Sequence, residues 1–139
     1  MNQQPFTEST FQSYLARHKL MASRCSACGA LHLPPRPLCP DCFGDDLHWT
    51  EVSGSGKLLA FTVIHIAPTA MIEAGYGRDK PYVVAVVVLD EGPGISAQLL
   101  GVDAANPQTI AVGMPLRATF VERGEGEGQR TFLAFQPAD

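Results

Sequence analysis

The sequence predicts a mainly β protein in three parts: a short N-terminal helix, a small cysteine-rich module and a five-stranded barrel. Three observations support this. Helical spacing of apolar residues occurs only near the N-terminus, and four cysteines cluster before residue 43. Beyond residue 50, short apolar segments alternate with turns, in a chain of 139 residues that holds 13 glycines and 11 prolines. We place the three parts at residues 1–20, 21–49 and 50–139.

The first part is a helix within residues 7–20. Its apolar residues at helical spacing are Phe11, Tyr14, Leu15 and Leu20. Thr7 or Ser9 would cap its start. A helix this short is marginal in isolation, so it must dock either on its own chain or on a partner subunit.

The second part is defined by two Cys-x-x-Cys pairs that hold all the cysteines of the chain: Cys25, Cys28, Cys39 and Cys42. Each pair presents two thiolates to one edge of an ion, and the ten residues between the pairs allow the return that closes the tetrahedron. Four thiolates leave no coordination position for water, which predicts a structural rather than a catalytic metal. Zinc is the preferred ion and iron the less favoured one.

Disulfides and a redox dithiol are the alternatives for these cysteines. Residues 1–5 have neither a basic start nor an apolar core, so they do not resemble a secretory signal, and we expect a cytoplasmic protein, in which disulfides are rare. The presence of two Cys-x-x-Cys pairs also favours metal ligation over a redox function. No apolar run reaches the roughly 18 residues of a membrane helix. Gly29, directly after the first pair, is placed to adopt a positive φ.

The third part consists of strands and turns. The predicted strands are 57–66, 82–89, 95–100, 116–121 and 131–136, with turns at 54–56, 91–94 and 124–128. A glycine-rich start and a long link at 67–80 suit a small closed barrel of the OB type, with a five-stranded sandwich as the alternative. We assign Leu58 and Ala60 to one face of the first strand, Leu59 and Phe61 to the other, and His65 to a packed position near its end.

Four phenylalanines of these strands are assigned to the core: Phe61, Phe120, Phe132 and Phe135. The first two strands are apolar on both faces, which exceeds what a small barrel can bury. We therefore expect the chain alone to be sticky or to form a homodimer.

The cysteine module resembles the rubredoxin-like zinc ribbon of the DUF35 family. The residues that carry the resemblance are Cys25-x-x-Cys28-Gly29, Pro34-Pro35-Arg36 and Cys39-Pro40-x-Cys42. The similarity continues, in the family's order, through Gly54-Ser55-Gly56, Phe61-Thr62-Val63, Pro81-Tyr82, Leu89-Asp90-Glu91-Gly92-Pro93 and Val112-Gly113-Met114-Pro115-Leu116. It implies an N-terminal helix, a zinc ribbon and a C-terminal OB-fold.

The resemblance also implies a function beside acyl-CoA enzymes. Family members are similar to accessory subunits of thiolase-like enzymes, including aldolases that shorten steroid side chains, and of acetyl-transfer complexes; others pair with hotdog-fold enoyl-CoA hydratases. It implies a non-catalytic subunit that helps assemble such a complex and shape its acyl-CoA passage, while the partner holds the catalytic residues.

The residues themselves predict no catalytic site. The sequence has no Ser/His/Asp residues in the order of a catalytic triad, no Gly-x-Ser-x-Gly nucleophile motif and no pair of carboxylates at a spacing suited to acid–base catalysis. These absences disfavour a small enzyme that acts alone. His32 and His48 flank the cysteine loops and are assigned supporting or surface roles. The link at 67–80 combines apolar and basic residues, which suit either a ligand with an apolar tail or ordinary packing on the barrel.

Coenzyme A carries phosphates that require cations nearby. The basic residues proposed to contact acyl-CoA are Arg36, Lys57, Arg78 and Lys80.

A nucleic-acid-binding zinc-ribbon and OB protein is the competing function, because both modules occur in that setting. The net charge of −4 argues against it, since such binding depends on neutralising phosphates. Basic residues are also not interleaved with exposed aromatic residues along the predicted strands.

Overall fold

The computed structural model describes residues 5–124 and 126–138. The predicted leader at 1–5 and turn at 124–128 therefore lie partly outside the described residues. In chain order the elements are α1 (Glu8–Ala16), β1 (Met21–Cys25), β2 (Leu31–His32), β3 (Leu47–Glu51), β4 (Ser55–Ile64), α2 (Thr69–Glu73), β5 (Tyr82–Leu89), β6 (Gly94–Leu99), η1 (Pro107–Thr109), β7 (Pro115–Arg123), η2 (Gly126–Gly128) and β8 (Arg130–Pro137).

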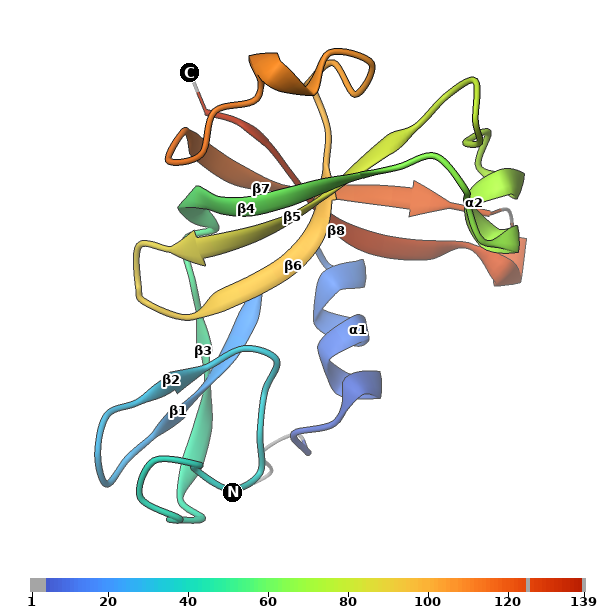
Figure 1. The fold of residues 1–139 in the computed structure, drawn as a ribbon. Coiled ribbons are helices and arrows are strands. Elements are labelled where there is room, and N and C mark those ends of the chain that lie inside the picture. Colours follow the sequence, from blue (N-terminus) through green and yellow to red (C-terminus); the bar gives the residue numbers. More distant parts are fainter. Residues whose placement is uncertain (1–4, 125, 139) are drawn as a thin grey trace.

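Strands β4 to β8 close into a barrel in the order β4-β5-β6-β8-β7 (Figure 1). Strand β6 runs parallel to β8, and every other neighbouring pair is antiparallel. The pairing of Ser55, Gly56 and Lys57 with Arg117, Leu116 and Pro115 joins β4 to β7 and closes the ring. The OB-type barrel is thus confirmed, and the sandwich alternative is wrong.

A β-bulge in β4 overturns the predicted assignment of its faces. The pairing of β4 with β5 shifts register between Leu58 and Ala60. Leu58 is buried at 1% exposure, whereas Leu59 is 56% exposed. Because a bulge adds one residue, it reverses the alternation that follows. Phe61, assigned opposite to Leu58, consequently packs against the same core as Leu58.

The outer ends of the strands correct two further assignments. Strand β4 ends at Ile64, so His65 lies beyond it and is exposed rather than packed. Phe135 is fully buried, but Phe132 is 39% exposed and does not belong to the core. Phe132 faces outward because it lies an odd number of residues from Phe135 on one strand. Within the predicted link at 67–80, Thr69–Glu73 forms the short helix α2.

The cysteine module forms a three-stranded sheet in the order β2-β1-β3, which we call the ribbon. Strands β1 and β3 pair along their whole lengths, from Met21 opposite Glu51 to Cys25 opposite Leu47. These short strands were not predicted, since 21–25 and 47–51 carry no long apolar pattern. The ribbon lies below the barrel in Figure 1.

Helix α1 joins the ribbon and the barrel through a single core. Its buried residues Phe11 and Leu15 belong to the same apolar cluster as Leu20 and Ala22 of the ribbon side and Phe135 of the barrel. The helix therefore docks on its own chain rather than requiring a partner subunit. Its predicted cap is also present, because the Thr7 side chain accepts a hydrogen bond from the backbone N–H of Thr10 at 3.2 Å.

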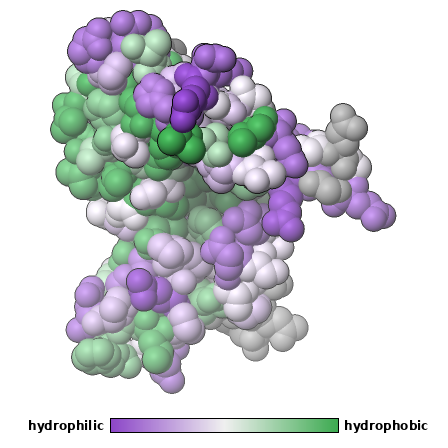
Figure 2. All heavy atoms as spheres, turned by 45° about the vertical axis from the view of Figure 1, so that its right-hand side comes forward, coloured by the Kyte–Doolittle hydropathy of each residue, from purple (hydrophilic) through white to green (hydrophobic). Residues whose placement is uncertain are grey.

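Apolar side chains also reach the surface. Figure 2 shows them spread over the flank of the barrel, with a smaller group at the lower end of the molecule. Among the described residues, the exposed large hydrophobic side chains are Leu38, Phe43, Leu59, Ile66, Ile72, Val112 and Phe132.

Candidate metal centre and barrel groove

The four cysteine sulfurs converge at the tip of the ribbon. All four lie within 4.8 Å of one another, and the closest pairs, Cys25 with Cys42 and Cys28 with Cys39, are 3.5 Å apart. A tetrahedral zinc with bonds of about 2.3 Å to sulfur has S···S edges of roughly 3.8 Å. The arrangement fits such an ion. Cys25 and Cys39 are buried while Cys28 and Cys42 face solvent, so the site lies at the surface.

Two matching backbone turns hold the sulfurs. In the first, Gly29 has φ +79° and its N–H donates to the carbonyl of Cys25 at 2.9 Å. In the second, Phe43 has φ +62° and its N–H donates to the carbonyl of Cys39 at 2.7 Å. The positive φ predicted for Gly29 is therefore confirmed, and the second knuckle adopts the same turn with a different residue.

The pKa values of the thiols reflect their mutual crowding. A backbone N–H of Cys28 is the main influence that lowers the pKa of Cys25 to about 7. The Ala30 backbone lowers the pKa of Cys28, but hydrogen bonding with Cys39, burial and the remaining sulfurs together raise it to about 12. A bound cation would favour all four thiolates, because its charge compensates their repulsion.

Two histidines support this end of the ribbon. Nε2 of His32 lies 3.4 Å from the sulfur of Cys39, and Nδ1 of His48 lies 3.2 Å from the hydroxyl of Ser26. A ring N–H of His32 directed at a thiolate would orient that ligand and moderate its charge.

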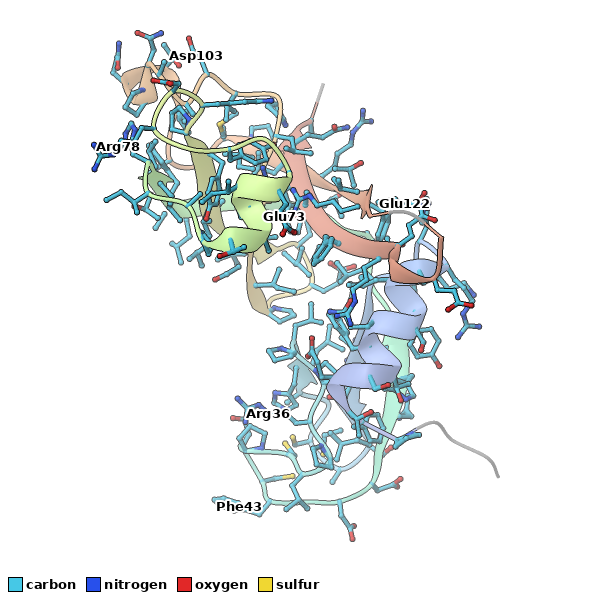
Figure 3. All side chains as sticks on the ribbon, turned by 90° about the vertical axis from the view of Figure 1, so that its right-hand side faces the viewer. Arg36, Phe43, Glu73, Arg78, Asp103 and Glu122 are labelled. Carbon is cyan, nitrogen blue, oxygen red and sulfur yellow. The ribbon has the colours of Figure 1, made fainter. Side chains whose placement is uncertain are left out.

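The four basic residues proposed for acyl-CoA contact do not come together. Arg36 lies on the ribbon, where its backbone N–H donates to the buried hydroxyl of Ser23 at 3.0 Å. Arg78 lies at the opposite end of the molecule (Figure 3). Lys57 is on β4, and Lys80 has its ammonium 5.2 Å from the ring centroid of Tyr76.

The structure instead reveals a groove between α2 and the barrel, which we call the α2 groove. Its larger part has a volume of about 880 Å³, within the range of small-molecule sites. Residues of that part come from α2, the following loop, the residue directly after β6 and the β7–β8 hairpin: Ala70, Met71, Glu73, Ala74, Tyr76, Leu100, Val121, Arg123, Gly124, Arg130 and Phe132. A smaller adjoining part extends over β5, β6 and β8 and shares Met71, Val121, Arg123 and Phe132 with it.

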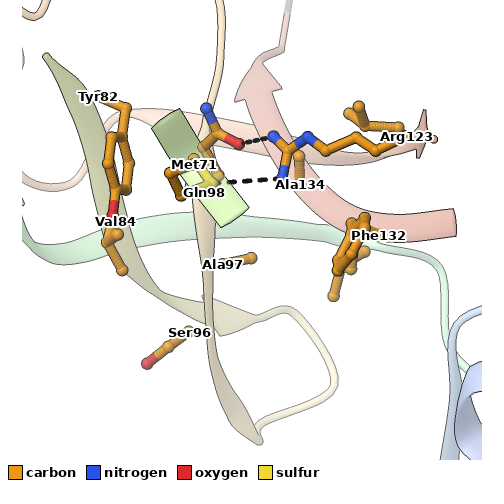
Figure 4. A pocket seen from close by; sticks show the side chains of 11 residues that line it. Met71, Tyr82, Val84, Ser96, Ala97, Gln98, Arg123, Phe132 and Ala134 are labelled. Carbon is orange, nitrogen blue, oxygen red and sulfur yellow. Dashed lines mark hydrogen bonds between the residues drawn. The ribbon is translucent and has the colours of Figure 1, made fainter. Parts of the chain in front are cut away.

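Arg123 is the central polar residue of this groove (Figure 4). Its guanidinium donates to Oε1 of Gln98 and approaches the sulfur of Met71 at 3.6 Å. The same group lies 5.2 Å from the ring centroid of Phe132. Gln98 in turn donates to the hydroxyl of Tyr76 at 3.0 Å. The guanidinium of Arg123 is thus held in place by neutral and aromatic groups. The apolar surroundings strengthen its electrostatic attraction for an anion.

Sequence reasoning missed Arg123. The available signal was positional: Val121 pairs with Phe132 and Arg123 with Arg130, which puts all four on one face of the hairpin. Assigning Phe132 to the core obscured that face.

In the described parts of the chain, no helix is both long and apolar enough to cross a membrane.

Family models match most of the chain. One, described as the ChsH2 rubredoxin-like zinc ribbon domain, matches residues 13–48, and another, the ChsH2 C-terminal OB-fold domain, matches residues 49–121. The zinc ribbon and its four-cysteine site agree with the metal predicted from the cysteine spacing.

Curated relatives are of two kinds. A DUF35 domain-containing scaffold protein of Methanocaldococcus jannaschii is 31% identical over 75% of this chain and 69% of its own length. A probable enoyl-CoA hydratase alpha subunit of Thermomonospora curvata is 34% identical over 88% of this chain but only 34% of its own length. A 3-oxo-4,17-pregnadiene-20-carboxyl-CoA hydratase alpha subunit of Mycobacterium tuberculosis is 35% identical over 76% of this chain and 30% of its own. The chain thus spans about a third of each hydratase subunit.

Solved structures share the whole architecture. A chain of an Ltp2-ChsH2(DUF35) aldolase has a TM-score of 0.76 and 29% identity, covering 99% of this chain and 98% of that one. A DUF35 family protein of unknown function from Sulfolobus solfataricus has a TM-score of 0.63 at 19% identity, which supports the fold alone.

Proposed function

This chain belongs to the DUF35 family, and from that membership we propose that it is a non-catalytic accessory subunit of an acyl-CoA-processing enzyme. The catalytic partner is a thiolase-superfamily acyltransferase or aldolase, or a hotdog-fold enoyl-CoA hydratase. In this role the chain helps to assemble the complex and shapes the acyl-CoA passage.

One observation carries the proposal. The chain matches a structure called an Ltp2-ChsH2(DUF35) aldolase from end to end, over 99% of its own length and 98% of the other chain. The names of the curated relatives, scaffold proteins and hydratase alpha subunits, point the same way.

The chemistry of the metal centre supports a structural role. Four thiolates fill the coordination sphere of a tetrahedral zinc, leaving no position at which the metal could activate water or a carbonyl. The ion then fixes the shape of the ribbon, and the reaction belongs to the partner.

The α2 groove supports a role in the passage. Met71 and Phe132 give it apolar walls that suit an acyl chain, and Arg123 gives it a fixed cation that suits a carbonyl oxygen or a phosphate. Of the basic residues proposed from the sequence, Lys80 has its ammonium over the ring of Tyr76, which lines the groove. A cytoplasmic location, where free thiols persist, belongs to the same proposal.

Reconstitution tests the proposal. The chain is co-expressed with the thiolase-like protein or hydratase encoded beside it, and the purified complex is assayed on acyl-CoA esters of increasing length. We expect a stable complex whose activity exceeds that of the catalytic subunit alone. Failure to co-elute with any such enzyme would overturn the proposal. Tight binding of single-stranded nucleic acid at low salt would also overturn it.

The groove is tested by Arg123→Gln within the complex. We expect kcat/KM to fall while complex formation is unchanged, because the cation is lost but the fold is not. Lys19→Gln is the matched control, since Lys19 is an exposed cation that neither lines the groove nor belongs to the residues proposed for acyl-CoA contact.

A further inference from the structure

The two knuckles of the ribbon use different residues at the position with positive φ. Both knuckles consist of Cys-x-x-Cys followed by a residue with positive φ, and in both its N–H donates to the carbonyl of the first cysteine. The first knuckle has Gly29 at this position, with φ +79°, and the second has Phe43, with φ +62°. The chain itself therefore provides the comparison: glycine meets the geometric requirement, and phenylalanine is used instead.

Phenylalanine is a costly choice at this position. A residue with a Cβ crowds its own backbone in the left-handed region, a penalty that glycine avoids. Packing within the chain does not offset the penalty, because Phe43 is 82% exposed, more than any other large hydrophobic residue among those described. A strained and exposed aromatic residue requires an explanation outside the fold of this chain.

The surroundings of Phe43 indicate the kind of surface that would receive it. Leu38 is 56% exposed on the same loop and extends the apolar surface. The exposed carboxylates Asp41, Asp45 and Asp46 surround it in sequence. A zinc ion with four thiolates would add a net charge of −2 to these carboxylates. Two cations oppose this charge: Arg36, at this end of the ribbon (Figure 3), and Arg24, whose guanidinium donates to the carbonyl of Gly29 at 2.9 Å. The tip is thus an apolar projection within a negative rim.

We propose that Phe43 is a docking anchor, which inserts into an apolar pocket with a basic rim on the catalytic subunit. Buried aromatic anchors dominate many protein interfaces, and complementary charge around them guides association. The inference rests on the proposed function for the identity of the partner and goes beyond it by naming the surface and the residue.

The decisive variant is Phe43→Gly, because it removes the anchor and relieves the strain together. We expect unchanged zinc content, an unchanged or higher melting temperature, and at least about a tenfold loss of affinity for the catalytic subunit, measured by calorimetry. Phe43→Ala keeps the unfavourable φ, so it should lose the same affinity without the gain in stability. Leu59→Ala is the matched control, since it truncates an exposed apolar residue on the barrel and should leave affinity unchanged.

The rim is tested by the triple variant Asp41→Asn, Asp45→Asn and Asp46→Asn. We expect slower association and a weaker dependence of the association rate on salt.

The failures of the two proposals differ. If Phe43→Gly binds the catalytic subunit as tightly as the unmodified chain, the anchor is overturned and the proposed function stands. If the unmodified chain binds no thiolase-like or hydratase subunit, both are overturned. If Phe43→Gly instead converts a dimer of this chain into a monomer on size-exclusion chromatography, the occupant is a second copy and the anchor as stated is wrong.

Discussion

The cysteines of the ribbon supply the metal ligands and also form the two backbone turns that position them. Cys39 shows the combination most clearly: it is fully buried, its sulfur contacts those of Cys28 and the ring of His32, and its carbonyl accepts the N–H of Phe43. Replacing this single residue should therefore be enough to lose the metal.

We expect Cys39→Ser to abolish zinc binding and unfold the ribbon. Structural zinc contributes about 10 kcal/mol or more in zinc-finger peptides, and a three-ligand site with a buried hydroxyl cannot replace it. Metal analysis together with circular dichroism measures both effects. Leu38→Ser, at the exposed neighbouring position, is the control and should retain one zinc per chain. A folded, zinc-loaded Cys39→Ser protein would contradict the assignment.

Glu91 is a second residue whose contribution is testable, through pH. Its carboxylate accepts hydrogen bonds from the backbone N–H of Ser53 at 2.7 Å and from the Ser53 hydroxyl at 3.3 Å. Partial burial raises the pKa of Glu91, but hydrogen bonds from the backbone of Ser53, from the backbone of Glu91 itself and from the Ser53 hydroxyl outweigh it, so the pKa is lowered. A carboxyl with a lowered folded-state pKa stabilises the fold above its unfolded pKa and loses that contribution as pH falls through the folded pKa.

We therefore expect Glu91→Gln to be less stable than the unmodified chain at pH 7, by at most about 1 kcal/mol because solvent screens an exposed carboxylate. The difference should shrink as the pH falls below the ordinary carboxyl pKa and through the lower folded-state pKa of Glu91. Denaturant titrations at several pH values measure it, and Glu127→Gln serves as the exposed control. An equal difference at pH 7 and pH 3 would show that the charge is not the cause.

At the scale of elements, helix α1 is the part whose role the structure clarifies most. Sequence spacing predicted the helix and its cap, but it could not determine whether the helix docks on this chain or on a partner. That depends on where the surface of β8 lies, and β8 is more than 110 residues further along the chain. The buried positions of Phe11 and Leu15 answer the question.

We expect Leu15→Ala to lower the free energy of unfolding by about 2–4 kcal/mol, because it leaves a cavity between the helix and the barrel. Leu15 is 2% exposed. Leu59→Ala makes the same chemical change at a 56% exposed position and should cost little. Equal losses for the two variants would mean that the helix does not contribute to the core.

Sequence patterns predicted five strands, their order in the chain and the metal ligands, because each of these depends on neighbouring residues. The bulge at Leu59 could not be predicted from the sequence, since it depends on how β4 pairs with β5. The α2 groove was equally beyond reach. Its central cation, Arg123, acquires its setting only when α2 folds over the β7–β8 hairpin and Gln98 of β6 comes alongside.

At the scale of the whole molecule, the ribbon and the barrel share one apolar core. Leu20 and Val52 come from the two ends of the ribbon segment, yet they belong to the same cluster as Leu58 of the barrel. Loss of the metal should therefore destabilise the barrel as well as the ribbon.

We expect the zinc-loaded chain to unfold in a single cooperative transition, and a chelator to lower the melting temperature of the barrel as well as that of the ribbon. Protons compete with zinc for thiolates, so the chelator should act more readily as pH falls. Calorimetry with and without chelator, at pH 6 and pH 8, measures both effects. Two separate transitions, of which only one responds to chelator, would contradict the shared core.

The packing of α1 against β8 has a consequence for synthesis on the ribosome. The helix is translated before every strand, and β8, which it contacts more extensively than β1, is translated after every other strand. Strand β8 is also the element that joins β6 to β7 and completes the ring. The ribbon can fold early around its metal, but the barrel and the helix must wait for the same late segment. Until then Phe11 and Leu15 lack the barrel surface that completes their burial, so the helix is a natural target for a chaperone during translation.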